Sequence, residues 1–276
     1  MDEGRSDQDE DRVIVHIDLD AFYAQVEGVR LGIDPSEPLA VQQWNSVIAV
    51  NYPARNYGVS RHLSLEKVLL KCPHIKLVHV ETLPLDSLPV ESLNHTKNQQ
   101  QPDQSKDSLE RYRRASQKIM KLLSENCDGS IFERASIDEA FLDVTKPVTK
   151  MLHSQTVSDS ELESALSTSF TPTSDDKKSI AANMTLDLSL ISHRRLALGA
   201  VIAQNLRYLI YSELKFTCSA GISFNKTFAK LGSGWCKPNA QTIFCSSDTS
   251  AMLNTLPLKK IRNLGGKLGA LLLNAG

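Results

Sequence analysis

The chain has 276 residues, of which 41% are hydrophobic and 23% are charged, and its formal net charge is -1. This length and composition favour a globular protein with one large hydrophobic core or two to three smaller ones. A membrane protein is excluded, because no apolar run reaches the roughly 18 to 20 residues that cross a bilayer, and the acidic N-terminus differs from a signal peptide. We therefore expect a protein inside the cell.

The cysteines and the charge distribution narrow the class further. The five cysteines are scattered without a C-x-x-C pair, which favours reduced thiols over a disulfide framework or a structural zinc site. Residues 190–276 contain eleven Lys and Arg but only two acidic residues. A solvated basic surface would explain this excess, but the basic residues lie in short motifs with glycines, so we favour a polyanionic partner.

The N-terminal part is predicted to begin with a disordered acidic leader, residues 1–11, and then to alternate short strands and helices. Strands are expected at 13–17, 39–43, 47–50 and 75–80, and helices at 21–30 and 63–72. Residues 83–108 are rich in Pro, Asn, Gln and Ser, so we interpret them as a polar linker or insertion.

The C-terminal part is predicted to be mixed. Helices are expected at 109–124 and 196–214, and strands at 131–132, 140–144, 217–222 and 242–244. Residues 146–190 are predicted to be a flexible insertion, because 11 of the 21 residues from 154 to 174 are Ser or Thr.

The order of these elements predicts an α+β fold. When residues 22–108 are set aside, the succession is β-α-β-β-α-β, which is typical of a split βαβ, ferredoxin-like sheet. Its helices would cover the sheet and leave acidic residues at the ends of the strands.

Three acidic residues are the candidate catalytic centre. Asp138 and Glu139 lie in a turn between two apolar segments, and Asp18 ends the first buried strand. If these strands are neighbours, the three carboxylates converge. Carboxylate oxygens suit Mg²⁺, and two such ions can activate a hydroxyl and stabilise a leaving pyrophosphate. Each acid alone could equally cap a turn or face solvent.

Basic clusters supply candidate phosphate ligands. Tyr52, Arg55 and Arg61 could bind phosphates, although a core tyrosine and surface ion pairs would also explain them. A second cluster contains Lys226, Lys230 and Lys237. The third is a glycine turn that exposes backbone amides beside basic side chains, which indicates contact with a DNA backbone. Its residues are Lys259, Lys260, Arg262, Gly265, Gly266, Lys267 and Gly269.

Together these motifs resemble the Y-family DNA polymerases, most closely their fungal eta-type members. The matching segments are 15–27, 43–50, 52–61, 133–140, 218–223 and 264–269. The resemblance implies a right-hand polymerase with a ferredoxin- or RRM-like palm, small fingers and an incomplete helical thumb. The palm would be 12–20 and 109–247, the fingers 21–82, and the start of the thumb, with a helix-hairpin-helix-like turn, 248–276.

The resemblance also implies roles for particular residues. Asp18, Asp138 and Glu139, with the Leu19 carbonyl, would hold two magnesium ions. Tyr23, beside Phe22, would be the steric gate that rejects a ribose 2′-OH. The triphosphate would be bound by Tyr52, Arg55 and Lys237, and the paired bases would be covered by Gln43 and Arg61.

By the same resemblance, the function would be translesion DNA synthesis in the nucleus, with dNTP inserted opposite damaged bases such as ultraviolet-induced pyrimidine dimers. Expected partners are primer-template DNA and dNTP, with the sliding clamp and other translesion factors bound through a C-terminal tail. The protein would be a monomer. The chain ends at Gly276, before the rest of the thumb and the little finger, so we expect weak, salt-sensitive binding of primer-template.

Two other functions remain open from the sequence. A palm-fingers fragment could bind DNA or partners with little or no catalysis. A haloacid-dehalogenase-like phosphatase also uses Asp-x-Asp after an apolar strand, but Phe22 stands where that family expects Thr or Val.

Overall fold

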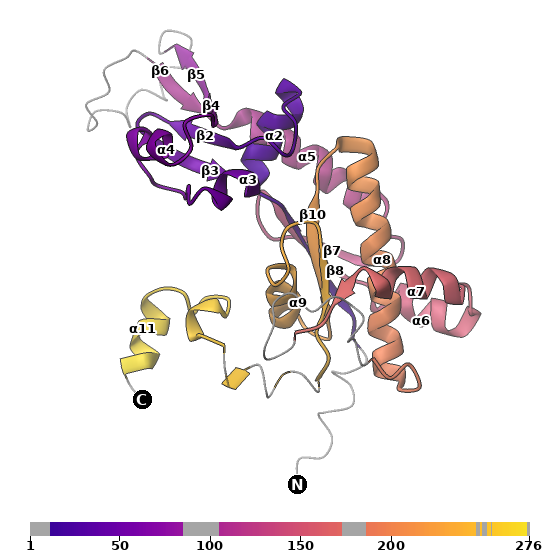
Figure 1. Ribbon diagram of the computed structural model, residues 1–276. Helices are drawn as coiled ribbons and strands as arrows, with labels where there is room; N and C mark the ends of the chain where they lie inside the picture. Colours follow the sequence, from indigo (N-terminus) through magenta and orange to yellow (C-terminus); the bar gives the residue numbers. More distant parts are fainter. Residues whose placement is uncertain are drawn as a thin grey trace. The chain divides into compact units, whose positions relative to one another are not determined.

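The structure is a computed structural model that describes residues 12–84, 105–172, 186–246, 249, 253–254 and 256–274. The predicted leader, 1–11, lies outside the described residues. The chain divides into two compact units (Figure 1). Unit 1 comprises Met1–Asp20 and Ile119–Gly276, and unit 2 comprises Ala21–Lys118.

A six-stranded mixed sheet forms the centre of unit 1, in the order β7-β8-β1-β10-β11-β9. Its strands are β1 (Ile14–Leu19), β7 (Ile131–Arg134), β8 (Glu139–Asp143), β9 (Ser169–Phe170), β10 (Cys218–Ser223) and β11 (Gln241–Ile243). β1 pairs antiparallel with both β8 and β10, while β11 is parallel to β10 and β9. β1 is central because its apolar side chains are buried on both faces.

Two helices cover opposite faces of this sheet. A Cβ on Gly221 would meet backbone atoms of α9 (Lys226–Ser233), whereas Ile222 faces Gly199 of α8 (Ile191–Leu214). Because neighbouring side chains in a strand point to opposite faces, α8 and α9 lie on different sides. Even-numbered residues of β1, including Asp18, share the α9 face.

The predicted α+β class is confirmed, and the sheet of unit 1 is mixed. With α5 (Glu110–Glu125) included, the chain runs β1, α5, β7, β8, α8, β10 once the intervening segments are set aside, which is the predicted succession. The division between the two units falls within α5.

All five cysteines are free thiols, and three of them, Cys72, Cys218 and Cys245, are buried.

The predicted flexible insertion at 146–190 is wrong for its first half. The structure has α6 (Thr145–Ser154), α7 (Asp159–Ser167) and β9 there. A capping box joins Ser158 and Glu161 at the start of α7, and Leu162 and Ala165 are buried. The Ser and Thr residues therefore cap and border helices around a few apolar anchors. Residues 173–185 lie outside the described part.

Unit 2 contains a three-stranded sheet, β3-β2-β4, and confirms the strands predicted at 39–43 and 47–50, which pair antiparallel. Its strands are β2 (Leu39–Gln43), β3 (Ser46–Val50) and β4 (Lys76–His79), and its helices are α2 (Phe22–Leu31), α3 (Tyr52–Asn56) and α4 (Leu65–Lys71). Buried side chains such as Val47, Val50 and Val68 form its core. The polar linker begins and ends in a two-stranded pair, β5 (Glu81–Pro84) with β6 (Ser105–Ser108), and residues 85–104 lie outside the described part.

The C-terminal segment consists of a 3₁₀ turn, η4 (Leu258–Lys260), followed by α11 (Lys267–Asn274). A Cβ on Gly269 would lie 1.9 Å from the Leu264 carbonyl oxygen, so only glycine fits at this close approach. Across the described residues, every helix is too short or too polar to traverse a bilayer.

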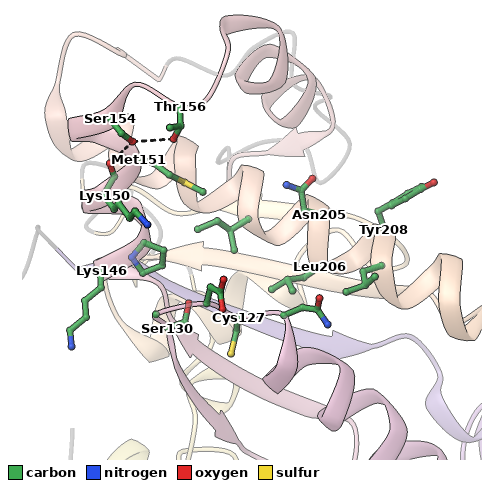
Figure 2. Close-up of a pocket in the computed structure, with 16 residues that line it drawn as sticks. Cys127, Ser130, Lys146, Lys150, Met151, Ser154, Thr156, Asn205, Leu206 and Tyr208 are labelled. Atoms are coloured by element: carbon green, nitrogen blue, oxygen red, sulfur yellow. Dashed lines mark hydrogen bonds between the residues drawn. The ribbon is translucent and has the colours of Figure 1, made fainter.

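A cavity of about 1000 Å³ lies in unit 1 between α6, α8 and the turn before β7 (Figure 2). Lys146, Lys150 and Met151 of α6 line one side, and Asn205 and Tyr208 of α8 line another. None of the residues that line it is a predicted site residue.

Candidate active site

The register of β1 and β8 brings the predicted catalytic acids together. Asp18 lies directly opposite Glu139 in the antiparallel ladder. The Asp138 carbonyl accepts a hydrogen bond of 3.0 Å from the Leu19 amide. The Asp138 carboxylate accepts one of 2.7 Å from the Ser136 hydroxyl, which holds it in the β7–β8 turn. The structure therefore places Asp18, Leu19, Asp138 and Glu139 together where β1 ends and β8 begins, and we call this end of the two strands the carboxylate edge.

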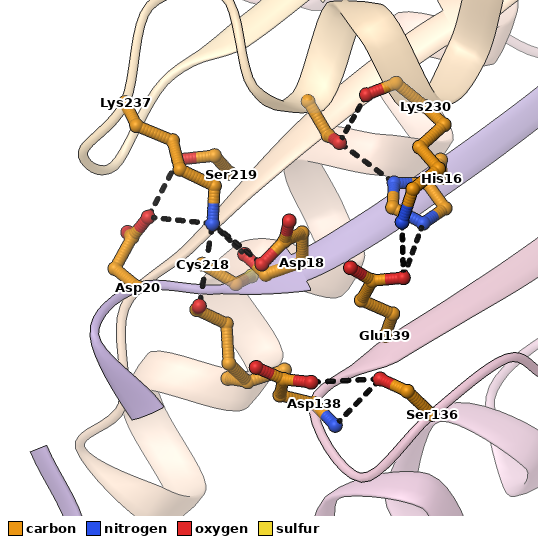
Figure 3. Close-up of polar contacts among 12 residues, drawn as sticks. His16, Asp18, Asp20, Ser136, Asp138, Glu139, Cys218, Ser219, Lys230 and Lys237 are labelled. Carbon is orange, nitrogen blue, oxygen red and sulfur yellow. Dashed lines mark hydrogen bonds and ion pairs between the residues drawn. The ribbon is translucent and has the colours of Figure 1, made fainter. Parts of the chain in front are cut away.

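Lys237, in the loop between α9 and β11, reaches this edge (Figure 3). Its Nζ lies 2.5 Å from Asp18 Oδ1 and 3.3 Å from the carbonyl oxygens of both Asp18 and Leu19. The Lys237 ammonium group thus contacts three oxygen atoms of two predicted metal ligands, Asp18 and Leu19.

Glu139 is held by residues on the α9 face. Lys230 donates a hydrogen bond to Glu139 Oε2, and Lys226 pairs with Glu133 on β7. His16 Nε2 lies 3.7 Å from Glu139 Oε2, beyond hydrogen-bond distance. The Ser233 hydroxyl donates to the Lys230 carbonyl at 2.9 Å and lies 2.7 Å from His16 Nδ1. The buried His16 ring is therefore held between Ser233 and Glu139.

The electrostatics of the two facing acids differ. Burial raises the pKa of Asp18 to about 6, assisted by Glu139 and Asp138, although Lys237 acts in the opposite direction. The His16 ring lowers the pKa of Glu139 to about 2, assisted by Lys230 and opposed by burial. Burial lowers the pKa of His16 itself. A further cation close to Asp18 would therefore stabilise the ionised form of this carboxylate.

The donor set fits a divalent cation, but the side chains are not gathered around one point. Among the described residues, no three His, Cys, Asp or Glu side chains are close enough together to hold a metal ion. Each acid is engaged elsewhere: Asp18 by Lys237, Glu139 by Lys230, and Asp138 by Ser136. Hard carboxylate and carbonyl oxygens are the ligands that Mg²⁺ prefers, and here an ammonium group already contacts them.

Asp20 belongs to this edge, although the sequence assigned it no role. It is only 1% exposed, and its carboxylate accepts hydrogen bonds from the Ser219 hydroxyl and the Asn239 amide, each at 2.8 Å. Its Oδ1 lies 3.6 Å from Lys237 Nζ. The signal was present: in a strand that continues past Asp18, Asp20 points to the same face.

The remaining predicted nucleotide ligands lie in unit 2. Tyr23 stacks on Tyr112, with ring centroids 4.1 Å apart and an interplanar angle of 12°, and Phe22 is buried beside it. Gln43 on β2 donates a hydrogen bond of 2.6 Å to Asp107.

Tyr52 and Arg55 are neighbours on α3, whereas Arg61 is exposed in the following turn. The Arg55 guanidinium lies 4.3 Å from the centre of the Tyr52 ring, and its Nε donates to the Val50 carbonyl at 3.1 Å. Asn51 is the N-cap residue of the short helix α3, and its side chain accepts a hydrogen bond from the Ala54 amide. This cap, with the ring contact, fixes the base of the Arg55 side chain.

The predicted DNA-contacting residues form an exposed basic stretch in the C-terminal segment. Lys259 and Lys260 lie in η4, Arg262 follows it, and Lys267 begins α11. Of these, Arg262 lies 5.6 Å from the centre of the Phe141 ring. Gly265 and Gly266 precede α11, whose first turn has no acidic residue.

A family model described as the impB/mucB/samB family matches residues 17–234. The match covers more than half of the chain and includes the whole carboxylate edge. The chain belongs to this family, the Y-family DNA polymerases. It contains the family's catalytic domain, so the recognition made from the motifs is confirmed. The haloacid-dehalogenase alternative is thereby set aside.

Relatives of this Y-family domain include polymerases of two types. The chain is 34% identical to DNA polymerase eta of Arabidopsis thaliana over 98% of its length, and 34% identical to human DNA polymerase iota over 93%. It is 35% identical over 95% of its length to N-acetyltransferase eso1 of Schizosaccharomyces pombe. These matches cover 38%, 30% and 31% of the relatives, so the chain spans about a third of their length.

A buried ion network supports unit 2 of the Y-family domain. Glu27 is fully buried and accepts hydrogen bonds from Arg30, Arg111 and Tyr112 at 2.8–2.9 Å. Burial alone would raise the pKa of Glu27, but these three donors outweigh it and lower the pKa below its usual value. Burial, followed by the hydrogen bond to Glu27, raises the pKa of Tyr112, and Arg111 opposes this increase. The network joins α2 to α5 behind the Tyr23 ring.

Replacing Glu27 with Ala should lower the free energy of unfolding by about 3 kcal/mol, because it leaves buried donors without their acceptor. Denaturation followed by Trp44 fluorescence in a Trp235→Phe background would measure this. A folded-state pKa below the unfolded value contributes stability above the unfolded pKa, and that stability is lost as the pH falls through the folded pKa. Glu27→Gln should therefore remove part of the acid sensitivity.

Glu110→Ala is the matched control for Glu27, because Glu110 is an exposed acid whose pairs with Arg113 and Arg114 should contribute less than about 0.5 kcal/mol. Equal effects of the Glu27 and Glu110 substitutions would contradict the buried network.

Proposed function

We propose that this domain transfers a deoxynucleotide from dNTP to a primer under the direction of a template, with two magnesium ions held by Asp18, Asp138 and Glu139. The observation that carries the proposal is the β1–β8 register, which sets Asp18 opposite Glu139 and ties the Leu19 amide to Asp138. When bound there, magnesium ions would activate the primer hydroxyl and stabilise the leaving pyrophosphate.

Lys237 and Lys230 are proposed to change partners when the metal ions and nucleotide arrive. Both are flexible ammonium groups that now neutralise Asp18 and Glu139. A divalent cation can take over this neutralisation, which frees Lys237 to contact the triphosphate. The Leu19 carbonyl, already in contact with Lys237, would become a further metal ligand.

In unit 2, Arg55 and Tyr52 are proposed to bind the β and γ phosphates. The Arg55 Nε is engaged by the Val50 carbonyl, so the terminal nitrogens would make a bidentate phosphate contact. Gln43 and Arg61 would lie over the templating and incoming bases. Tyr23, with Phe22, would exclude a ribose 2′-OH.

The architecture of the family suggests which part of a right-hand polymerase each unit supplies. Unit 1 would supply most of the palm and the start of the thumb, and unit 2 would supply the fingers, 21–82, and residues 109–118 of the palm. The exposed basic stretch from Lys259 to Gly269 would bind the DNA backbone without reading its sequence. The eta-type and iota-type relatives support a translesion polymerase that copies damaged templates in the nucleus. As the resemblance implies, it would act as a monomer and would meet the sliding clamp through a C-terminal tail.

Primer extension on a template containing a cyclobutane thymine dimer tests the lesion-bypass proposal. Purified protein with Mg²⁺ and dNTPs should insert nucleotides opposite the dimer at a rate within about tenfold of that on undamaged DNA, because an open site tolerates the lesion. An undamaged template of the same sequence is the control. Synthesis that stops one nucleotide before the dimer would refute bypass while leaving polymerase activity intact.

Tyr23→Ala should raise ribonucleotide incorporation relative to deoxynucleotide incorporation by at least about tenfold, because removing the ring opens space beside the sugar. The ratio of kcat/KM for rCTP and dCTP on one primer-template measures the change. Tyr57→Ala, at an exposed tyrosine of the same unit, is the control and should leave the ratio unchanged. An unchanged ratio in the Tyr23 variant would remove Tyr23 from the steric gate.

A further inference from the structure

The loop between α9 and β11, residues 234–240, carries Lys237 to the carboxylate edge, and its conformation depends on Asn239. This residue has φ = 50°, in the left-handed region that few residues other than glycine adopt. Contacts from two sides hold Asn239 in this conformation.

Asp20 holds the backbone side of Asn239. Its Oδ2 accepts from the Asn239 amide at 2.8 Å, and its Oδ1 accepts from the Ser219 hydroxyl at 2.8 Å. A carboxylate that is 1% exposed needs such donors to compensate for its burial. Asp20 thereby links the end of β1 to both β10 and the loop (Figure 3).

Arg207 of α8 contacts the side chain of Asn239. Its Nη2 donates to Asn239 Oδ1 at 2.8 Å, and its Nε donates to the Cys218 carbonyl at 3.0 Å. Its Nη1 lies 3.2 Å from Oε1 of Gln241, which is fully buried in β11. The guanidinium group thus ties the loop to two strands with one rigid fork.

We propose that Asp20 and Arg207 are positioning residues that grip Asn239 from opposite sides and thereby hold Lys237 in place for binding of the dNTP triphosphate. This inference rests on the proposed role of Lys237 in nucleotide binding. Neither residue needs to touch the substrate. Displacement of the loop would move the Lys237 ammonium group away from the proposed position of the triphosphate beside Asp18 and Leu19, and the loss would be in nucleotide binding more than in chemistry.

Steady-state incorporation of a single dNTP by Asp20→Ala, Arg207→Gln and Lys237→Ala tests the proposal. Each should raise the KM for dNTP by roughly tenfold or more, with a smaller change in kcat. Combining Asp20→Ala or Arg207→Gln with Lys237→Ala should raise the KM little beyond that of Lys237→Ala alone, because all three act through the Lys237 ammonium group. Asp20→Asn, which keeps one acceptor for the Asn239 amide, should restore part of the KM. Arg194→Gln, an exposed arginine on the same helix, is the control.

Hydrogen-deuterium exchange of residues 234–241 gives a readout independent of activity. Faster exchange in Asp20→Ala and Arg207→Gln, with the rest of unit 1 unchanged, is the expected result. Unchanged exchange would overturn the grip on Asn239 even if the proposed polymerase activity holds. Faster exchange with an unchanged KM, or KM effects that multiply with those of Lys237→Ala, would overturn the positioning of Lys237. If wild-type protein incorporates no dNTP, the proposed function fails, and exchange alone decides whether the grip exists.

Discussion

Replacing Asp138 with Asn and Glu139 with Gln should lower magnesium-dependent nucleotide incorporation by at least about a thousandfold, equivalent to roughly 4 kcal/mol of transition-state stabilisation. Both substitutions keep the shape of the side chain and remove its charge. Without these charges, the strand edge would keep Asp18 as its only predicted carboxylate ligand, which is too little to hold two divalent cations. Single-turnover primer extension at saturating Mg²⁺ measures the loss.

Glu133→Gln is the matched control for these substitutions. Glu133 lies on the neighbouring strand β7 and pairs with a lysine of α9, as Glu139 does, but it is exposed and lies outside the facing pair of β1 and β8. Its substitution should change the rate less than about twofold, because an exposed ion pair contributes little. Circular dichroism should show that all variants remain folded. A rate within tenfold of wild type in the double variant would contradict the metal assignment.

Replacing Gly221 with Ala should destabilise unit 1 by about 3 kcal/mol or more. The new Cβ would lie 1.8 Å from the Ala229 carbonyl oxygen and 2.4 Å from the Ser233 amide nitrogen, both in the backbone of α9. The strand cannot move away easily, because Gly221 is paired with His16 on one side and with Thr242 on the other. The helix must therefore shift, and it carries Lys230 and the start of the Lys237 loop.

Urea denaturation followed by Trp235 fluorescence in a Trp44→Phe background would measure this effect, since the Trp235 ring packs edge-on against Phe244 at 5.5 Å. Gly266→Ala is the control, because no atom lies within 4 Å of the Cβ it would add. A loss of less than about 1 kcal/mol in Gly221→Ala would show that α9 does not pack on the sheet as described.

Much of the sheet of unit 1 could be predicted because its strands have strong local signals. β1 is a near-continuous apolar run, interrupted by His16, that reaches Asp18, and β8 begins at the acidic pair. The sequence does not show that β1 and β8 are neighbours, since pairing between residues more than 100 positions apart has no local signature. The register that sets Asp18 opposite Glu139 is a product of the whole sheet.

The composition of residues 145–170 predicts a flexible segment, whereas the structure has α6 and α7 there. Serine and threonine are poor helix formers in general, but at the N-cap they stabilise a helix. Ser158 and Glu161 form a capping box, and Leu162 and Ala165 repeat at helical spacing. These local signals were present in the sequence and could have predicted α7.

The partners of the site residues could not be predicted from the sequence. The motif identifies Lys237 and Asp18, but the bond between them joins residues 219 positions apart. Likewise, the two residues that contact Asn239 are Asp20, which follows β1, and Arg207 of α8. Such contacts depend on tertiary packing, and the spacing of residues within a motif carries no information about them.

We propose that the acidic residues at the carboxylate edge of β1 and β8 perform template-directed, magnesium-dependent nucleotide transfer. The most direct measurement is extension of a primer by one nucleotide at low salt, with primer-template in excess, each dNTP supplied separately and Mg²⁺ either present or chelated. We predict product only with Mg²⁺, predominantly from the complementary dNTP, and a change of preferred dNTP when the template base is changed. Product that forms without a divalent cation, or a preferred dNTP that ignores the template base, would contradict the account.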